Sequence, residues 1–254
     1  MGLRWPERLW VVRHGQSAGN VAREAAYEAD LPRIALAERD VDVPLSTHGE
    51  RQAQALGHWF AAMPAEDRPE SVLVSPYLRA TATAALIRDA GGFDRHEPLC
   101  LDERLREKEF GIIDGLTTRG LAELMPEQAA LRKSLGKFYH RPPGGESWCD
   151  VILRLRSLLD TVALHYAGRR VLIVAHQVVV LCLRYILEKM DEAAVLAIDR
   201  GEQLANCSVT EYRHDPAAGP GGGLVLERYN FVAPMEREAV EVTRGRDAHV
   251  AARG

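Results

Sequence analysis

Short apolar runs rich in β-branched residues alternate along this chain with stretches of helical periodicity, and no other feature constrains the fold as much. Such runs are typical of parallel strands that are covered on both faces. Strands that alternate with helices predict an α/β fold, a three-layer, mostly parallel central sheet with helices on both faces. The expected parallel strands are Leu9–Val12, Ser71–Val74, Glu97–Leu101 and Val171–Ala175.

Serine residues mark the expected starts of three helices. A serine hydroxyl can accept a hydrogen bond from a backbone N–H that has no partner within the first helical turn. Ser46 precedes one helical pattern, and Ser75 precedes a proline at the expected first position of another. Ser147 and Asp150 form a capping-box-like start for a third helix with a continuous apolar stripe.

Two further strands are expected late in the chain. The runs C-S-V-T-E-Y from Cys207 and L-V-L-E-R-Y from Leu224 are separated by a glycine-rich loop. A length of 254 residues, 46% of them hydrophobic, is enough to build one large core. We therefore expect a single domain over residues 1–234 and a charged, flexible tail over residues 235–254.

The composition excludes several classes of function. A formal net charge of −4 and an aromatic content of 6% argue against a nucleic-acid partner, which favours basic faces and stacking platforms. No apolar run approaches the ~18 residues of a membrane span, and the N-terminus has no apolar signal core, so we expect a cytoplasmic protein without a membrane partner. The four cysteines form no C-x-x-C pair and are expected to be free thiols.

Histidines follow two of the expected strands directly. The run V-V-R-H-G places Arg13 and His14 at the end of the first strand, and V-L-I-V-A-H places His176 at the end of the fourth. Ligands of open α/β sheets bind beyond the carboxyl ends of parallel strands. One histidine in such a place is more often a satisfied cap than a functional group. Two of them beside an arginine favour a functional site.

A second cation and an acid are expected at the same edge. The run S-P-Y-L-R places Arg79 one turn into the helix that follows the second strand. Two arginines and a helix N-terminus suit a dianion such as a phosphoryl group. One carboxylic acid nearby could donate a proton to a leaving oxygen. The segment after the third strand offers four candidates, between which charge alone does not choose: Asp102, Glu103, Glu107 and Glu109.

Four motifs in this order, R-H-G-Q-S, S-P-Y-L-R-A-T-A-T-A, L-R-E-K-E-F-G and V-L-I-V-A-H, resemble the histidine phosphatase superfamily, or phosphoglycerate mutase-like fold. The resemblance extends from about Leu9 to Tyr212. It implies that His14 is the nucleophile that takes the phosphoryl group and that Glu107, four residues before Gly111, is the proton donor. The other residues that it assigns to the phosphoryl group are Arg13, Asn20, Arg79 and His176.

This assignment requires neither a metal nor another cofactor. A neutral imidazole can attack phosphorus and split hydrolysis into two steps through a phosphohistidine. Arginines and a protonated histidine can stabilise the equatorial oxygens during transfer. The sequence has no H-E-x-x-H motif and no Cys/His cluster at ligand spacing. The expected partners are a small-molecule phosphate ester and, in a homodimer, a second copy of the chain.

Part of the chain is also similar to the fructose-2,6-bisphosphatase domain. There the positions that match Gln177, Arg132 and, with one inserted residue, Lys137 help to bind substrate. An arginine of that domain is Leu181 here, and two of its substrate-contacting tyrosines are replaced by Thr118 and Trp148. We therefore do not carry the sugar bisphosphate over. The expected substrate-side residues, which suit a metabolite with a second charge, are Asn20, Arg132, Lys137, Trp148 and Gln177.

Two questions stay open at the level of sequence. The segment Val21–Val43 is longer than in the bisphosphatase domain, and it is either a surface insertion or a flap over the site. The activity is expected to be that of a phosphatase. Mutases of the family have a longer insertion after the acid motif and a glycine where Gln177 stands. A mutase and a non-catalytic phosphate-binding regulator remain the alternatives.

Overall fold

The computed structural model describes residues 4–93, 98–201, 203–219 and 221–245. Within them a central sheet has the strand order β3-β2-β4-β1-β5-β6. The first four strands in this order are parallel, whereas β5 runs antiparallel to both β1 and β6. The strands are β1 (Arg8–Arg13), β2 (Ser71–Val74), β3 (Leu99–Leu101), β4 (Arg170–Ala175), β5 (Val209–Asp215) and β6 (Gly223–Phe231).

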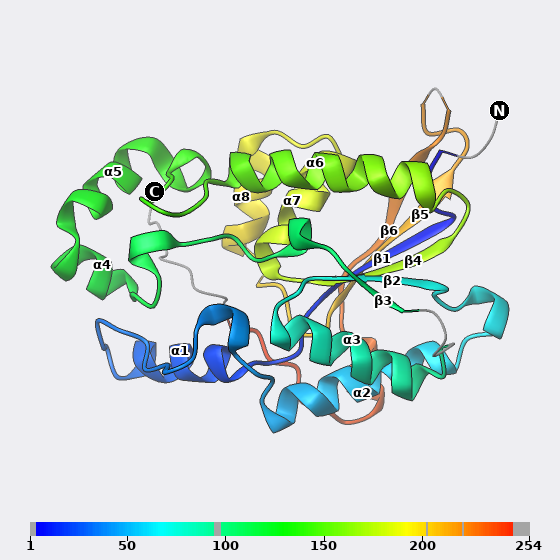
Figure 1. Ribbon diagram of the computed structural model, residues 1–254, viewed down its shortest axis with the longest axis horizontal. Helices are drawn as coiled ribbons and strands as arrows, with labels where there is room; N and C mark the ends of the chain where they lie inside the picture. Colours follow the sequence, from blue (N-terminus) through cyan, green and yellow to red (C-terminus); the bar gives the residue numbers. More distant parts are fainter. Residues whose placement is uncertain (1–3, 94–97, 202, 220, 246–254) are drawn as a thin grey trace.

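Helices cover both faces of the sheet, and the mostly parallel α/β fold that the sequence predicts is confirmed (Figure 1). All six expected strands are present, although Glu97 lies outside the described residues. The helices are α1 (Ala18–Glu28), α2 (Thr47–Ala61), α3 (Leu78–Gly91), α4 (Thr118–Leu124), α5 (Pro126–Tyr139), α6 (Trp148–His165), α7 (Gln177–Leu187), α8 (Glu192–Gly201) and α9 (Ala233–Arg237).

The alternating side chains of β1 divide the core into two layers. Leu9 and Val11 pack in a cluster with the apolar stripe of α6 and with α7. Trp10 and Val12 pack on the opposite face with residues of α2 and α3. All four side chains are at most 1% exposed. Because successive residues of a strand point to opposite faces, a continuous apolar run is what a strand between two helical layers needs.

Two of the three expected serine caps are confirmed, and the third is wrong. Ser46 accepts a hydrogen bond from Gly49 N at the start of α2, and Ser147 forms a full capping box in α6. Helix α3, however, begins at Leu78 and has Tyr77 as its N-cap. The hydroxyl of Ser75 instead accepts a hydrogen bond from the Tyr77 N–H at 3.3 Å, so the chain stays extended past the proline.

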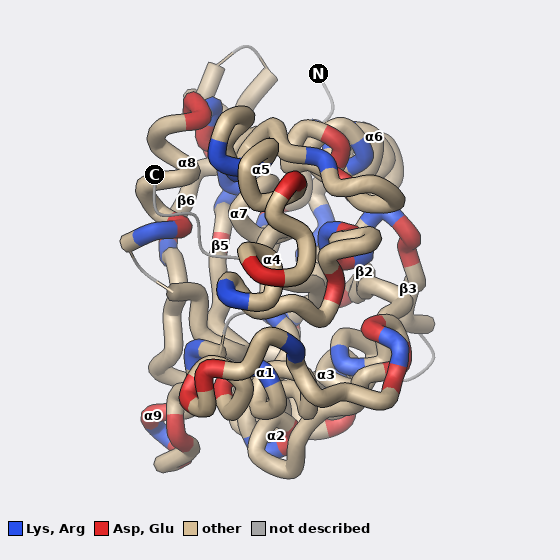
Figure 2. The backbone as a smooth tube through the Cα atoms, turned by 90° about the vertical axis from the view of Figure 1, so that its left-hand side faces the viewer, with Lys and Arg blue, Asp and Glu red and all other residues tan. Residues whose placement is uncertain are grey.

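One end of the molecule is built from segments that are far apart in the sequence. Helix α1 lies below α4 and α5 in both views (Figures 1 and 2). The Val21–Val43 segment contains most of α1 and continues to the 3₁₀ turn Asp40–Asp42.

Among the described residues, no helix combines the length and the apolar character that a membrane crossing requires.

The described part of the C-terminal segment packs against the rest of the protein. Met235 is fully buried in the core layer of α2 and α3. Gln52 of α2 donates hydrogen bonds to the Glu241 carbonyl and to the Thr243 hydroxyl, at 3.0 and 2.8 Å. Residues 246–254 of the expected tail lie outside the described residues.

Candidate active site

The sheet brings the two predicted histidines together. Strands β1 and β4 are parallel neighbours, and Arg13 pairs in register with Ala175. His14 and His176 therefore leave the sheet side by side, with their ring centroids 5.2 Å apart and the rings inclined at 61°. Both residues are fully buried. The strand-end argument from the sequence thus puts these side chains where the structure has them.

The hydrogen bond of His14 fixes which ring nitrogen carries its proton. Nδ1 lies 2.7 Å from the carbonyl oxygen of Gly15. A carbonyl oxygen only accepts, so Nδ1 is the donor and carries hydrogen. In the neutral ring, the nucleophilic lone pair is then on Nε2. The carbonyl of His14 accepts a hydrogen bond from Asn206 Nδ2 at 3.1 Å, which helps to hold the backbone of this residue.

The turn after His14 makes a close backbone contact with α2. A Cβ atom on Gly15 would lie 2.5 Å from the Gly49 carbonyl oxygen, and one on Gly49 would lie 2.0 Å from the Gln16 oxygen. The N–H of Gly15 donates to Thr83 Oγ1 at 3.0 Å, so α3 holds the same turn. Two glycines and one threonine therefore position the turn that carries His14, the predicted nucleophile, and only Gly15 belongs to the histidine motif.

His176 joins the end of β4 to the start of α7. It is the N-cap residue of α7, where the helix dipole favours negative charge. Its Nε2 lies 2.8 Å from Ser75 Oγ, and its ring centroid lies 5.1 Å from that of Tyr77. The sequence predicts Ser75 only as a helix cap. Its position directly after β2 is the signal that its hydroxyl also contacts His176.

Arg79 lies in the first turn of α3, and its guanidinium contacts Asp40 of the Val21–Val43 segment. Its Nη1 lies 2.5 Å from the Asp40 carbonyl oxygen and 3.0 Å from Asp40 Oδ1, and its Nη2 lies 3.3 Å from Oδ2. The guanidinium carbon is 4.9 Å from the centre of the Tyr77 ring. The segment thus places a carboxylate on one of the two predicted phosphoryl-binding arginines.

Arg13 is held by two backbone carbonyls. It donates from Nη1 to Leu204 at 2.5 Å and from Nη2 to Gly245. Asn20 Nδ2 also donates to the Gly245 carbonyl, at 3.3 Å, and its Oδ1 completes the capping box of α1 with Ser17. Arg13 and Asn20 therefore share a partner from the C-terminal segment, which sequence reasoning did not connect with the site.

The structure separates the four candidate acids. Asp102 is paired with Arg104 at 2.6 Å, and the 74% exposed side chain of Glu103 lies on the surface. Glu109 accepts a hydrogen bond from the Tyr77 hydroxyl at 3.0 Å. Only Glu107 of the four lines the cavity that contains Arg79, among the residues that the structure describes.

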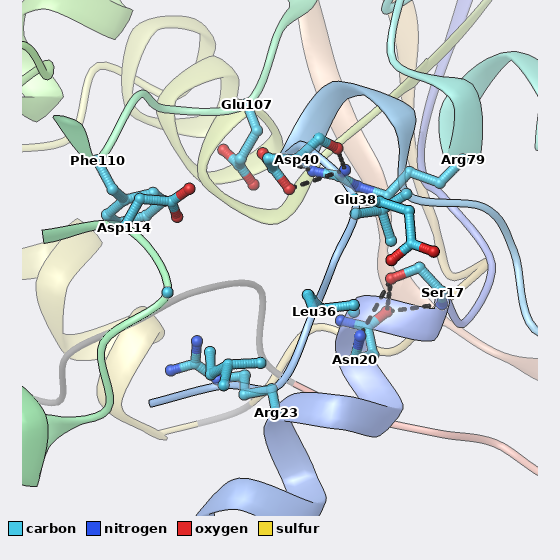
Figure 3. A pocket seen from close by; sticks show the side chains of 14 residues that line it. Ser17, Asn20, Arg23, Leu36, Glu38, Asp40, Arg79, Glu107, Phe110 and Asp114 are labelled. Atoms are coloured by element: carbon cyan, nitrogen blue, oxygen red, sulfur yellow. Dashed lines mark hydrogen bonds and ion pairs between the residues drawn. The ribbon is translucent and has the colours of Figure 1, made fainter. Parts of the chain in front are cut away.

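This cavity has a volume of about 150 Å³ (Figure 3). Glu107 is 2% exposed and accepts a hydrogen bond from the backbone N–H of Lys108 at 2.7 Å. Burial lowers the pKa of the Lys108 ammonium to about 8.

In the described part of the chain, no three histidine, cysteine, aspartate or glutamate side chains are grouped as metal ligands.

Of the expected substrate-side residues, Asn20 lines this cavity. The described lining residues do not include Arg132, Lys137, Trp148 or Gln177. Gln177 and Arg132 are buried in α7 and α5, and burial lowers the pKa of Arg132. Lys137 Nζ lies 2.5 Å from Asp199 Oδ2 and 5.4 Å from the Trp148 ring centre. Trp148 is 1% exposed and belongs to the core layer of α6. Contact of these four residues with substrate stays a prediction.

The model of the histidine phosphatase superfamily (branch 1) matches residues 9–220, and the chain therefore belongs to this superfamily. The resemblance drawn from the four motifs is confirmed. Members of the family act on small phosphate esters, and the two histidines, two arginines and glutamate described above lie within the matched range.

Relatives of known name cover nearly the whole chain. The probable phosphoglycerate mutase GpmB of Yersinia enterocolitica is 28% identical over 236 residues, which cover 92% of this chain and 97% of the relative. A mycobacterial glucosyl-3-phosphoglycerate phosphatase, solved in complex with VO3, is 26% identical with a TM-score of 0.67 and covers 89% of this chain and 99% of its own. YhfR of Bacillus stearothermophilus is 25% identical with a TM-score of 0.70, covering 90% and 98%.

Proposed function

We propose that the protein is a phosphomonoester hydrolase that acts on a small phosphorylated metabolite through a phosphohistidine on His14. The observation that carries the proposal is the anchored ring of His14. Nδ1 is held by the Gly15 carbonyl, which directs the lone pair of Nε2 away from the backbone and beside His176. An imidazole held in one tautomer is a prepared nucleophile.

In the first step, Nε2 of His14 attacks phosphorus, and the bond to the ester oxygen breaks as the phosphorus–nitrogen bond forms. Glu107 gives its proton to the departing alcohol oxygen. In the second step, water attacks phosphorus while the phosphorus–nitrogen bond breaks, which releases inorganic phosphate and returns the lone pair to Nε2 of His14. The proton of the attacking water passes to Glu107 and restores the acid. Arg13, Arg79 and His176 stabilise the charge on the equatorial oxygens, together with the N-terminus of α7. No metal takes part in this scheme.

A mutase is the second candidate, because the curated relatives carry that name. In a mutase the phosphohistidine returns the group to a sugar acid, whereas in a phosphatase it gives the group to water. Gln177 at the first position of α7 favours the hydrolase, since the mutases of the family have glycine there. The mycobacterial relative, whose name is that of a phosphatase, supports the same choice.

The test is hydrolysis of p-nitrophenyl phosphate, run in EDTA because the proposed mechanism uses no metal. His14→Ala removes the nucleophile and should abolish phosphate release, while the wild-type protein traps acid-labile phosphate on His14. His58→Ala is the matched control, because His58 is 54% exposed on α2 and pairs with Glu238 at 3.5 Å, remote from the site. A His14→Ala protein that retains most of the activity would contradict the proposal. Passage of the trapped phosphate to a sugar acid rather than to water would favour the mutase.

A further inference from the structure

The Val21–Val43 segment supplies part of the wall of the active-site cavity. Leu36, Glu38 and Asp40 line the cavity together with Arg79 and Glu107 (Figure 3). The segment is therefore not a remote surface insertion. Its side chains lie in the same cavity wall as Arg79, one of the two arginines assigned to the phosphoryl group. Two of the three are carboxylates.

A third carboxylate reaches the cavity from the opposite side. Asp114 lines it from the turn before α4, and Figure 3 shows its carboxylate turned toward the same space as those of Asp40 and Glu107. Burial raises the pKa of Asp114, and the negative charges of Asp40 and Glu109 raise it further. The wall beyond the catalytic groups thus concentrates negative charge in a partly buried place, where charge–charge interactions are stronger than in water.

The cavity wall has fewer cations than carboxylates among its described residues. Among the described residues, Arg23 and Arg79 are the cations that line the cavity. Arg79 is assigned to the phosphoryl group and contacts Asp40. The guanidinium carbon of Arg23 lies 5.0 Å from the centre of the Tyr27 ring, and Nη2 donates to the Tyr27 hydroxyl at 3.3 Å. Besides Arg79, a second anionic group on the substrate would therefore meet one cation in the described wall, Arg23, against the three carboxylates of Glu38, Asp40 and Asp114.

We propose, building on the hydrolase function above, that this acidic wall selects the substrate. The site takes phosphate monoesters of small uncharged alcohols that carry further hydroxyl groups, and it disfavours esters whose alcohol part carries a second anionic group. Carboxylates accept hydrogen bonds from hydroxyl groups and repel other anions. The ring of Phe110 and the side chain of Leu36 supply apolar surface for the carbon skeleton. A cavity of about 150 Å³ suits a small alcohol.

The opposite expectation came from the sequence, in which Arg132 and Lys137 suit a second negative charge. The two interpretations predict opposite orders for two esters with the same three-carbon skeleton. Glycerol 3-phosphate ends in a hydroxymethyl group, and 3-phosphoglycerate ends in a carboxylate at the same carbon. We expect kcat/KM for glycerol 3-phosphate to exceed that for 3-phosphoglycerate by about tenfold or more, since one unfavourable pair of nearby charges has at least this effect at reduced dielectric. Inhibition constants of both compounds against p-nitrophenyl phosphate hydrolysis give the same order without requiring turnover.

Neutral variants of the wall test which residues cause the preference. Glu38→Gln and Asp114→Asn, singly and together, should bring the ratio of the two inhibition constants to within about threefold, because each removes one repulsive charge while keeping the shape. Asp40→Asn should act in the same direction. Asp42→Asn is the matched control, since Asp42 is an exposed residue of the same 3₁₀ turn and does not line the cavity; its ratio should equal that of the wild type.

The outcomes separate this inference from the function on which it rests. Hydrolysis of p-nitrophenyl phosphate with an equal or higher preference for 3-phosphoglycerate overturns the acidic filter and leaves the hydrolase intact. A preference for glycerol 3-phosphate that the variants leave unchanged also overturns it. A wild-type protein that hydrolyses no phosphate ester overturns both proposals. A preference that is lost in Glu38→Gln and Asp114→Asn and kept in Asp42→Asn supports the filter.

Discussion

At the scale of single residues, burial and partners distinguish several similar side chains that are candidates for the general acid. Four carboxylic acids follow β3 within eight positions, and each has an environment of its own. Asp102 is tied to Arg104, Glu103 is in solvent and Glu109 holds the Tyr77 hydroxyl. Glu107 alone among them lines the described cavity, which supports its proposed role as the general acid.

A change of Glu107 to glutamine should affect substrates according to their leaving groups. Alkyl phosphates need a proton on the departing oxygen, so their kcat/KM, which reports the first step, should fall by about 10²–10⁴-fold. p-Nitrophenolate leaves without a proton, so kcat/KM for its phosphate should fall by less than about tenfold, even where loss of the base in the second step lowers kcat. Steady-state kinetics with both esters checks this, and Glu103→Gln is the exposed control. An equal loss for both esters would exclude Glu107 as the acid.

Lys108, next to the acid, makes the stability of the protein depend on pH. Its pKa falls from 10.5 in an unperturbed lysine to about 8 because of burial. The folded protein therefore binds this proton less tightly than the unfolded chain, so the charged side chain lowers the free energy of unfolding at pH 7 by about 3 kcal/mol. This decrease in the free energy of unfolding is fully present below pH 8 and disappears as the pH rises to 10.5.

The variant Lys108→Met removes the charge and keeps an unbranched side chain. It should be more stable than the wild type at pH 7, and the difference should shrink above pH 8. Urea unfolding of both proteins at a series of pH values between 6 and 10 measures this. A difference that stays constant across the series would show that the pKa of Lys108 is not depressed.

At the scale of elements, helices α2 and α3 position the loop that carries His14, the proposed nucleophile. The Gly15–Gly49 contact leaves no room for a side chain on either residue. In Gly49→Ala the new Cβ would lie 2.0 Å from the Gln16 oxygen, so the loop or the helix has to move. Such overpacking costs about 1–3 kcal/mol, and a displaced nucleophile costs up to ~100-fold in rate.

Thermal unfolding and p-nitrophenyl phosphate hydrolysis together check the Gly49→Ala prediction. We expect a lower Tm and a lower kcat. Gly201→Ala is the control, because a Cβ on Gly201, at the end of α8, would have no atom within 4 Å. If Gly49→Ala keeps the wild-type kcat, the contact with α2 does not position His14.

At the scale of the whole molecule, the described part of the C-terminal segment, residues 235–245, packs against the rest of the fold. Met235 is buried, and Val240 and Val242 pack against the same core layer. The Gly245 carbonyl reaches Arg13, 232 positions earlier in the sequence. The chain end that the composition describes as a charged tail therefore contributes both apolar contacts and a partner for a predicted catalytic arginine.

A chain that ends at Pro234 should be markedly less stable than the full protein. Loss of one buried methionine alone costs about 2–5 kcal/mol, which corresponds to a Tm lower by roughly 4–20 °C for a protein of this size. Calorimetry checks this, with a chain that ends at Gly245 as the control. An unchanged Tm for the shorter chain would place the end of the folded unit at residue 234, as the composition indicates.

The sequence by itself determined the strands, the two-layer core and the meeting of His14 with His176. These features depend on periodicity over a few residues and on the rule that parallel strands share an edge. The choice of Glu107 among the four acids, by contrast, came from the resemblance of L-R-E-K-E-F-G to the family motif. Each of these inferences needs only residues that are close together in the chain, or a sheet whose type the pattern already defines.

Only the tertiary structure decided what surrounds these residues. Asp40 contacts Arg79 across 39 positions, and the tail carbonyl contacts Arg13 across 232. Trp148, expected at the substrate, packs in the core at the start of α6. Such contacts depend on how irregular segments fold back onto the sheet, and no local periodicity encodes that path. The charge of the cavity wall, and with it the proposed selection of substrate, follows from these long-range contacts.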